Sequence, residues 1–470
     1  MINYLKYSEN KTSLIVGIII GILSSTIGAV LSYSNIWIAS GIVISFALIS
    51  WALMRSEIIL WSAIVISLIL PFGTLPLKLI ITPTFLDITL VGIYAIFIAN
   101  YITKHPKTLS GSPVHTPIIV FILLSIICFI LGLANSFHSL NLFRKFTVFI
   151  LNIGLSIVVV EQTNNLYQLN KTLKIIICSG FVAAIIGIVL YFLPPDLSQQ
   201  ILNYLGTINY PTGNVLRYIE DNPENPLRAI GTSVDPNLFG GILAVVGTIL
   251  IPQILHKPSI IHNKLTSLFI LTTIVLALFL TYSRTAMAAF LISTIFIVFM
   301  TNRNFLWTIV LILLIITLLP WSHQYLSHFV QGISGNDLAT NMRFGEYKDA
   351  IILISRYPVF GVGFGGAPDI DVYLGVSSAY LLLSEQVGLV GFSSFATILI
   401  ILFTWGIKNK SRILSITQIS SQWIGIYGAI LTTTIVGLFD HYFVNLEFQA
   451  SQTFFWIIIG LSIVTTKLSQ

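Results

Sequence analysis

Apolar residues run through this chain in long blocks that short polar connections separate. Most blocks are roughly 17–22 residues long, which is the length that an α-helix needs to cross about 30 Å of hydrocarbon. They lack the alternation of apolar and polar positions that is typical of a membrane β-barrel, the other fold that satisfies its backbone in lipid. We therefore predict an all-α polytopic membrane protein with about 14 transmembrane helices, forming a single domain over residues 1–470. The expected spans are 13–33, 36–54, 57–76, 84–103, 116–134, 141–160, 172–193, 236–255, 265–281, 285–301, 304–320, 378–405, 421–440 and 447–466.

The composition also indicates that lipid surrounds the fold. Of the 470 residues, 56% are hydrophobic and 9% are charged, and the mean hydropathy is +0.93. A soluble domain carries about a quarter charged residues, so this chain lacks the charge to cover soluble cores. The first block is long and no soluble domain follows it, which argues against a cleavable signal peptide. Cys128 and Cys178 lie within apolar blocks, so neither a disulfide framework nor a cysteine metal site is indicated.

The distribution of basic residues predicts the orientation of the spans. With the N-terminus in the cytoplasm, fourteen of the 23 basic residues fall at the inner connections, as the positive-inside rule requires. The opposite orientation would place nearly all of them outside, so we expect both termini to lie in the cytoplasm. The inner basic residues are Lys6, Lys11, Arg55, Lys104, Lys107, Lys171, Lys174, Lys257, Lys264, Arg303, Lys408, Lys410, Arg412 and Lys467.

The outer basic residues differ in kind from the inner ones. Six of the nine are arginine, against three of the fourteen inside. Positive charge outside opposes the topology rule and needs another reason, and arginine offers a planar fork of donors that grips phosphate oxygens. Fourteen of the seventeen acidic residues also fall outside, so pairing with these acids is the structural alternative. The outer basic residues are Lys78, Arg144, Lys145, Arg217, Arg228, Arg284, Arg343, Lys348 and Arg356.

Two outer connections are large, at residues 194–235 and 322–377. The second contains the segment Asn341–Arg356, whose apolar residues recur at helical spacing. This pattern predicts an amphipathic helix that lies at the membrane surface and ends before Pro358. The residues expected on its apolar face are Phe344, Tyr347, Ile351 and Ile354.

A first candidate segment leads into the span that begins at residue 236. Asp235, Pro236 and Asn237 fit a helix start, with Asp235 as the cap and the proline in the first turn. That structural role alone would account for Asp235. Arg228 is not explained by it, so we single out Arg228 as a candidate for binding substrate.

A second segment, Ser283-Arg284-Thr285, joins two apolar blocks through almost no loop. A charged side chain between two membrane helices is costly unless it reaches the interface or pairs with another charge. Arg284 is therefore a functional candidate, with Ser283 as a motif residue beside it.

A third candidate segment begins in the large outer loop. Arg343 opens the predicted surface helix, and a glycine-rich stretch follows at 357–366, which is a weak signal by itself. Asp369 and Asp371 resemble the metal-binding aspartate pair of many soluble sugar transferases. Two acids in a loop are more often solvated, so we expect no metal site.

A fourth candidate segment stands at the outer end of the span 421–440. The adjacent side chains of Asp440 and His441 could tune one another for acid–base chemistry. A histidine beside aromatic residues at the membrane interface is equally often structural.

Taken in order, these segments resemble the O-antigen ligase and O-antigen or exopolysaccharide polymerase superfamily of bacterial membrane proteins. The shared pattern is an arginine before Asp-Pro-Asn, then Ser-Arg-Thr between two spans, then a large outer loop. That loop opens on an arginine-bearing helix, continues through Tyr-Pro-x-x-Gly-x-Gly, and ends before a stretch with a glutamate and two glycines. All parts occur here over roughly residues 220–395. The spans before residue 200 match in hydropathy only.

The resemblance implies a metal-independent, cofactor-free glycosyltransferase with a GT-C-like fold, acting on the outer face of the bacterial cytoplasmic membrane. Such enzymes take a glycan from undecaprenyl diphosphate and join it to an acceptor. Arg228, Arg284 and Arg343 would then bind the diphosphate and stabilise the charge that grows on it as it leaves. The implied partners are the lipid-linked oligosaccharide, membrane lipid, and a flippase or chain-length regulator. No nucleic acid is expected.

One departure from the family pattern concerns the acceptor. Ligases of the family usually carry a histidine where the loop enters the next span, in a His-Asn-x-Tyr-Leu setting, and it is thought to activate the acceptor hydroxyl. The matching stretch here is Ser377-Ser378-Ala379-Tyr380-Leu381, which keeps Tyr380 as a motif residue and lacks the histidine. A general base must reach the acceptor hydroxyl. The remaining candidates for this catalytic role are Asp371, Glu385, Asp440 and His441.

The missing histidine favours a polymerase, which transfers a growing glycan to the next lipid-linked repeat unit. A ligase that joins finished glycan to a lipid, protein or wall acceptor is the first alternative. A transporter of anions or of a lipid-linked precursor is the second. Transporters commonly show paired broken helices in two repeats, whereas the distinctive residues here gather on one side of the membrane.

Overall fold

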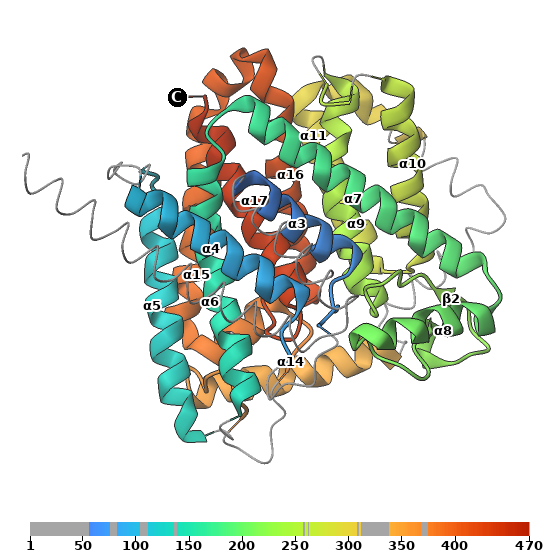
Figure 1. Ribbon diagram of the computed structural model, residues 1–470, viewed down its shortest axis with the longest axis vertical. Coiled ribbons are helices and arrows are strands. Elements are labelled where there is room, and N and C mark those ends of the chain that lie inside the picture. The colour runs from blue at the N-terminus through green and yellow to red at the C-terminus, as the bar shows by residue number, and fades with distance from the viewer. Residues whose placement is uncertain are drawn as a thin grey trace, which may run out of the picture. The chain divides into compact units, whose positions relative to one another are not determined.

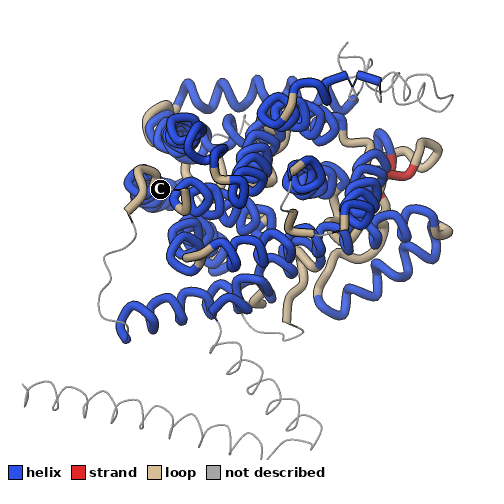
Figure 2. Tube along the Cα trace, turned by 90° about the horizontal axis from the view of Figure 1, so that it is seen from above, coloured by secondary structure: helices blue, strands red, loops and turns tan. Residues whose placement is uncertain are grey.

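A computed structural model of the chain describes most residues from Ser56 onward, with gaps. The chain divides into two compact units, Met1–Ile59 and Leu60–Gln470. The described part of the second unit is almost entirely helical (Figures 1 and 2), which confirms the all-α prediction. The expected spans 13–33 and 36–54, most of 304–320, and the candidate Asp371 lie outside the described residues. The described ranges are 56–75, 82–103, 111–135, 139–256, 259–261, 263–307, 310–311, 338–367 and 375–469.

Eight helices in these ranges are long and apolar enough to cross a membrane. Each overlaps a predicted span, as do three further helices, α3 (Ser56–Ile69), α10 (Lys264–Leu280) and α17 (Gln449–Lys467). The chain therefore has the character of a polytopic membrane protein, and the total of about 14 spans stays a prediction. The eight are α4 (Phe85–Thr103), α5 (His115–Gly132), α6 (Leu140–Gln162), α7 (Leu166–Phe192), α9 (Pro236–Leu255), α11 (Arg284–Thr301), α15 (Ala379–Ser415) and α16 (Thr417–Phe439).

The core of the second unit is formed by α9, α16 and α17. Helix α9 packs against α16, α10 and α11, and α17 packs against α6 and α16. Every residue of α17 from Gln449 to Thr466 is buried, which explains how a membrane helix can carry so many hydroxyl and amide side chains. Its hydroxyls donate to carbonyls of the preceding turn, for example Ser462 to Ile459 at 2.6 Å, so these polar groups are satisfied away from water.

Several irregular elements cover one end of this core. The outer connection predicted at 194–235 is folded, with helix α8 (Pro195–Tyr204) and a two-stranded hairpin of β1 (Arg217–Tyr218) and β2 (Leu227–Arg228). Helix α14 (Leu338–Arg356) runs across the ends of the long helices rather than along them (Figure 1). The starts of α9, α11 and α15 and the end of α16 meet at this end. The 3₁₀ segments are η1 (Leu133–Asn135), η2 (Leu205–Ile208), η3 (Ile219–Asp221) and η4 (Arg303–Phe305).

The orientation of α14 is consistent with the expected helix at the membrane surface. On its apolar face Phe344 and Ile351 are 59% and 61% exposed, whereas Tyr347 and Ile354 are half-buried. The side toward the protein carries Ala350 and Leu353 together with half-buried charged residues. This side meets polar helix ends, and the exposed apolar residues are free to contact lipid.

The glycine-rich loop after α14 closes a break in α15. At Gly388 the helix is interrupted by a left-handed backbone conformation with φ +65°, and a Cβ there would collide with the carbonyl of Val359. The residues on either side of the break leave carbonyl and N–H groups without helical partners, and the loop supplies partners for them. The bonds are Val362 N–H to Glu385 O (2.8 Å), Gly363 N–H to Gln386 O (3.0 Å), Leu389 N–H to Pro358 O (2.8 Å) and Val390 N–H to Val359 O (3.4 Å).

Candidate functional site

Arg228 connects the first two segments that the sequence singled out. Its Nε donates to the carbonyl of Thr281 at 2.8 Å, and its Nη2 donates to Oδ1 of Asn237 at 2.7 Å. The hairpin that bears Arg228 is thereby fixed to the start of α9 and to the turn between α10 and α11. Main-chain pairing of Ala229 N–H with Leu280 O at 2.8 Å strengthens this attachment.

Asp235 and Ser283 are helix caps. Oδ1 of Asp235 accepts from the N–H groups of Asn237 and Leu238 at 2.8 and 2.9 Å, and the Ser283 hydroxyl accepts from Ala286 N–H at 3.5 Å. These side chains satisfy backbone donors at the first turns of α9 and α11. The structural interpretation of Asp235 is therefore correct.

The two caps follow strained residues. Val234 has φ +64° and Tyr282 has φ +52°, in the left-handed region that a β-branched or aromatic side chain rarely adopts. Such conformations persist only where the surrounding structure enforces them, and they gather at functional sites. Arg284 and Arg228 lie near each other. The pKa of the Arg228 guanidinium is lowered mainly by burial, and the positive charge of Arg284 lowers it further.

Arg343 reaches this region from α14. Its Nη2 lies 3.1 Å from Oδ1 of Asp440, the residue that ends α16. Asp440 is 3% exposed, and its second oxygen, Oδ2, has no hydrogen-bond partner among the described residues. Arg343 and Arg228 thus both act on one buried carboxyl, Asp440, and Arg284 lies near Arg228.

Burial dominates the chemistry of Asp440. It raises the pKa of this carboxyl from 3.8 to about 7, with Asp235 acting in the same direction and Arg343 and Arg228 opposing it. Burial penalises the charged form of an acid, and neighbouring cations restore only part of that loss. Asp440 therefore exchanges a proton near neutral pH beside the arginines.

His441 is adjacent in sequence but differs in its role. Its Nδ1 lies 3.0 Å from Nδ2 of Asn445, and Oδ1 of that amide is occupied by the N–H of Glu447 at 2.9 Å. The amide nitrogen therefore faces the ring, so Nδ1 accepts and the proton of the neutral ring resides on Nε2. Burial lowers the pKa of His441, which keeps the ring neutral. In this tautomer the ring has no free lone pair with which to take up another proton.

Glu385 and Tyr380 lie in the first turns of α15. Glu385 is 1% exposed and neither carboxyl oxygen has a partner among the described residues. The charges acting on it are those of Asp349 and Glu346 on α14, not of the arginines. Tyr380 donates to the Thr434 carbonyl at 2.7 Å and fixes α15 to α16, which is a structural role.

Glu346 and Tyr347 of α14 were not among the site residues expected from the sequence. Oε2 of Glu346 accepts from the N–H of Ser377 at 2.8 Å, and the Tyr347 hydroxyl donates to the Ser377 carbonyl at 3.3 Å. Ser377 is the position at which the family pattern has its histidine. Glu346 lies one turn after Arg343 on the same helix, so its spacing from Arg343 was a signal that could have identified it.

Other outer cations have structural partners. Arg144 pairs with Asp87, and Lys145 pairs with Glu447, each at 2.5 Å. The simple pairing of outer bases with outer acids therefore holds at the start of α6.

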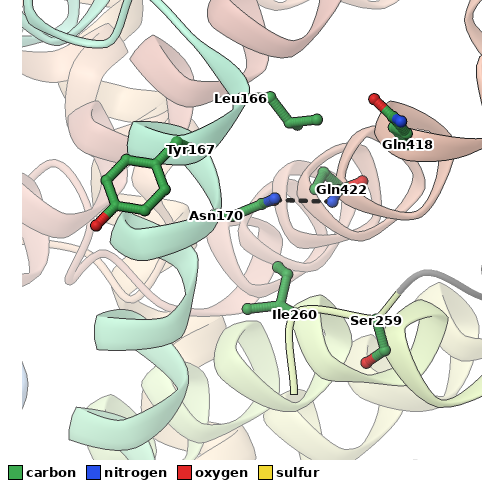
Figure 3. Close-up of a pocket in the computed structure, with 7 residues that line it drawn as sticks. All are labelled: Leu166, Tyr167, Asn170, Ser259, Ile260, Gln418 and Gln422. Carbon is green, nitrogen blue, oxygen red and sulfur yellow. Dashed lines mark hydrogen bonds between the residues drawn. The ribbon is translucent and has the colours of Figure 1, made fainter. Parts of the chain in front are cut away.

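A cavity of about 370 Å³ with a different character lies between the starts of α7 and α16 and the loop that follows α9 (Figure 3). Its polar residues are uncharged, and Asn170 accepts a hydrogen bond from Gln422 at 2.8 Å. Twenty residues of α9 separate its two ends by about 30 Å, so this cavity is remote from the arginines. An uncharged lining does not suit a diphosphate. The lining residues are Leu166, Tyr167, Asn170, Ser259, Ile260, Gln418 and Gln422.

Comparison with known protein families supports the resemblance. Residues 268–396 match the family model described as O-antigen ligase. This part of the chain is similar to the O-antigen ligase family. The match contains Arg284, Arg343 and Glu385, whereas Arg228 and Asp440 lie outside it. A comparison with curated proteins finds no match.

Members of the O-antigen ligase family are glycosyl-transferring enzymes, and the family implies a lipid-linked oligosaccharide as substrate. Together with the apolar helices, the match indicates a bacterial membrane protein. Among the described residues, no group of three or more histidine, cysteine, aspartate or glutamate side chains is arranged to hold a metal ion.

Proposed function

We propose that this protein is a membrane glycosyltransferase that polymerises oligosaccharide repeat units carried on a lipid diphosphate, on the outer face of the bacterial cytoplasmic membrane. The observation that carries the proposal is that Arg228 and Arg343 both lie near Asp440, with Arg284 near Arg228. These arginines come from three separate segments of the chain and gather at one end of the helical bundle. A cluster of three guanidinium groups suits a ligand with more than one negative charge.

In this proposal Asp440 occupies the anion position when no donor is bound. Its carboxyl balances Arg343, and near neutral pH it can be protonated and release that arginine. The diphosphate of undecaprenyl diphosphate would then take its place among the three guanidinium groups. As the bond between the sugar and the phosphate breaks, negative charge grows on the diphosphate, and fixed cations stabilise it.

A polymerase and a ligase are expected to differ on the acceptor side. The position that carries a histidine in family ligases is Ser377 here, and its backbone is held by Glu346 and Tyr347 of α14. A serine cannot serve as the neutral base that an imidazole provides. This difference favours a polymerase over a ligase with a lipid, protein or wall acceptor.

A transporter of anions or lipid precursors is the candidate from another class. The one broken helix within the described ranges, α15, has its break sealed by the loop 357–363. A transporter site would leave such backbone groups free to coordinate an ion. The geometry therefore favours surface chemistry.

Reconstitution tests the proposal. Purified protein in vesicles is given lipid-linked oligosaccharides extracted from the cells that express it. A ladder of products that grow by one repeat unit supports the polymerase, and a single transfer to a foreign acceptor supports the ligase alternative. Solute uptake without transfer would overturn the proposal. Adding a flippase or a chain-length regulator then shows whether either is a partner.

A further inference from the structure

We propose that Glu346 is a catalytic residue that takes the proton from the attacking hydroxyl of the acceptor sugar. This inference rests on the proposed glycosyl transfer and assigns the half of the reaction that the arginines do not perform.

The carboxylate of Glu346 is held in a fixed orientation. Oε2 accepts from the N–H of Ser377 at 2.8 Å, and the carbonyl of Ser377 accepts from the Tyr347 hydroxyl at 3.3 Å. Glu346 and Tyr347 thus bind the N–H and the carbonyl of Ser377, just before the start of α15. The second oxygen, Oε1, makes no hydrogen bond within the described part of the chain, so it can accept a proton.

Glu346 lies next to the arginine site without belonging to it. Arg343 precedes it by three residues on α14, and such residues are neighbours with about 5–6 Å between their Cβ atoms. Tyr347 lies near both groups, since the charges of Arg343, Asp440 and Glu346 all act on its hydroxyl. A base for the acceptor should lie beside the phosphate ligands but not among them, because the anomeric carbon and the attacking oxygen lie between the base and the phosphate.

The other carboxyls suit this role less well. Asp440 is 3% exposed and paired with Arg343, where a bound diphosphate would repel it. Glu385 is 1% exposed within α15, and no acceptor hydroxyl could reach it without opening the helix. Glu346 is half-buried at the rim, forms no ion pair with the described residues, and is therefore both oriented and accessible.

The step balances in atoms and charge. The acceptor oxygen forms a bond to the anomeric carbon of the donor while the bond between that carbon and the phosphate oxygen breaks. The bonding electrons leave with the diphosphate, which the arginines hold. The hydroxyl proton passes to Oε1 of Glu346 and is later released to water.

The test combines substitution with chemical rescue. Glu346→Gln should bind undecaprenyl diphosphate as tightly as the wild type, measured by thermal stabilisation, while transfer from extracted lipid-linked oligosaccharide falls by roughly 100- to 10,000-fold. In Glu346→Ala, added formate should restore part of the lost transfer, because a small carboxylate can occupy the vacated position. A purely structural role for Glu346 would give no such rescue.

Asp349→Asn is the matched control, since it makes the same chemical change three residues further along α14. It should retain near-wild-type transfer. Wild-type-like transfer by Glu346→Gln, an equal loss in Asp349→Asn, or failure of formate to rescue Glu346→Ala would each overturn the inference. If the wild type itself transfers no sugar, the proposed function fails instead, so the two failures are distinguishable.

Discussion

Arg343 and Asp440 form an ion pair of 3.1 Å between α14 and the end of α16, although 97 residues separate them in the sequence. The pair joins the large outer loop to the helical core. The charge of Arg343 also explains how a carboxyl that is 3% exposed can persist beside the arginine cluster. In the proposed function, a bound diphosphate replaces Asp440 as the partner of Arg343.

Removing the charge of Arg343 alone should lower the free energy of unfolding, whereas removing both charges of the pair should not. Arg343→Gln leaves the Asp440 carboxyl buried without its charged partner, which we expect to lower the free energy of unfolding by about 1–3 kcal/mol. The double variant Arg343→Gln with Asp440→Asn should recover most of that loss. Transfer should stay low in both, because Arg343 binds the donor in the proposed function. A thermal unfolding series with a parallel transfer assay checks this, and recovery of transfer in the double variant would contradict it.

The titration of Asp440 predicts a pH dependence of stability. Its pKa is raised from 3.8 to about 7, so the folded protein binds this proton more tightly than the unfolded chain does. The contribution of Asp440 to stability is therefore full below about pH 4 and is lost as the pH rises to about 7. Asp440→Asn does not titrate there.

The melting temperature of Asp440→Asn minus that of the wild type should therefore increase by a few degrees as the pH rises from about 5 to about 8. The unfolding of both proteins in the same detergent at each pH measures this. A difference that does not change with pH would show that Asp440 does not titrate in this range.

Arg284 should not tolerate lysine. Lysine keeps the charge but loses the planar fork, so we expect transfer by Arg284→Lys to fall by roughly 100-fold or more while the protein remains folded. Arg303→Lys makes the same change just beyond the far end of α11, at an exposed position, and should transfer normally. Near-wild-type turnover by Arg284→Lys would remove Arg284 from the site.

The break in α15 should depend on glycine at one position. In Gly388→Ala, the new Cβ meets the Val359 carbonyl in a backbone conformation that alanine resists. We expect a loss of about 1–3 kcal/mol from the backbone conformation alone, together with release of the loop. Gly345→Ala on α14 is the control, because no atom lies within 4 Å of its added Cβ, and it should gain about 0.5–1 kcal/mol in helix stability. Equal stability of the two variants would argue against the docked loop.

Much of this arrangement is predictable from sequence because membrane helices are defined by local properties. Asp235 and Ser283 were recognisable as boundary residues, since capping depends on the next three residues alone. Arg228, Arg284 and Arg343 stood out because arginine outside the membrane conflicts with the topology rule. Hydropathy and local motifs sufficed for these features.

The features that escaped prediction depend on distant partners. The polar contacts of α14 could not be assigned from its own residues, because the helix ends that it contacts are supplied by other segments. The proposed role of Glu346 depends on its hydrogen bond to Ser377, and the glycine-rich loop depends on backbone hydrogen bonds to the break near Gly388. Periodicity contains no information on such contacts.

We propose that the arginine cluster binds the diphosphate of a lipid carrier. The change in melting temperature on adding such a lipid measures this binding most directly. The probes are undecaprenyl diphosphate and undecaprenol, each added to the purified protein in the same detergent. We expect the melting temperature of the wild type to rise with the concentration of the diphosphate, and undecaprenol to have little effect. Arg284→Lys should lose most of the response to the diphosphate, whereas Arg303→Lys should keep it. Equal stabilisation by the two lipids, or an undiminished diphosphate response in Arg284→Lys, would contradict the proposal.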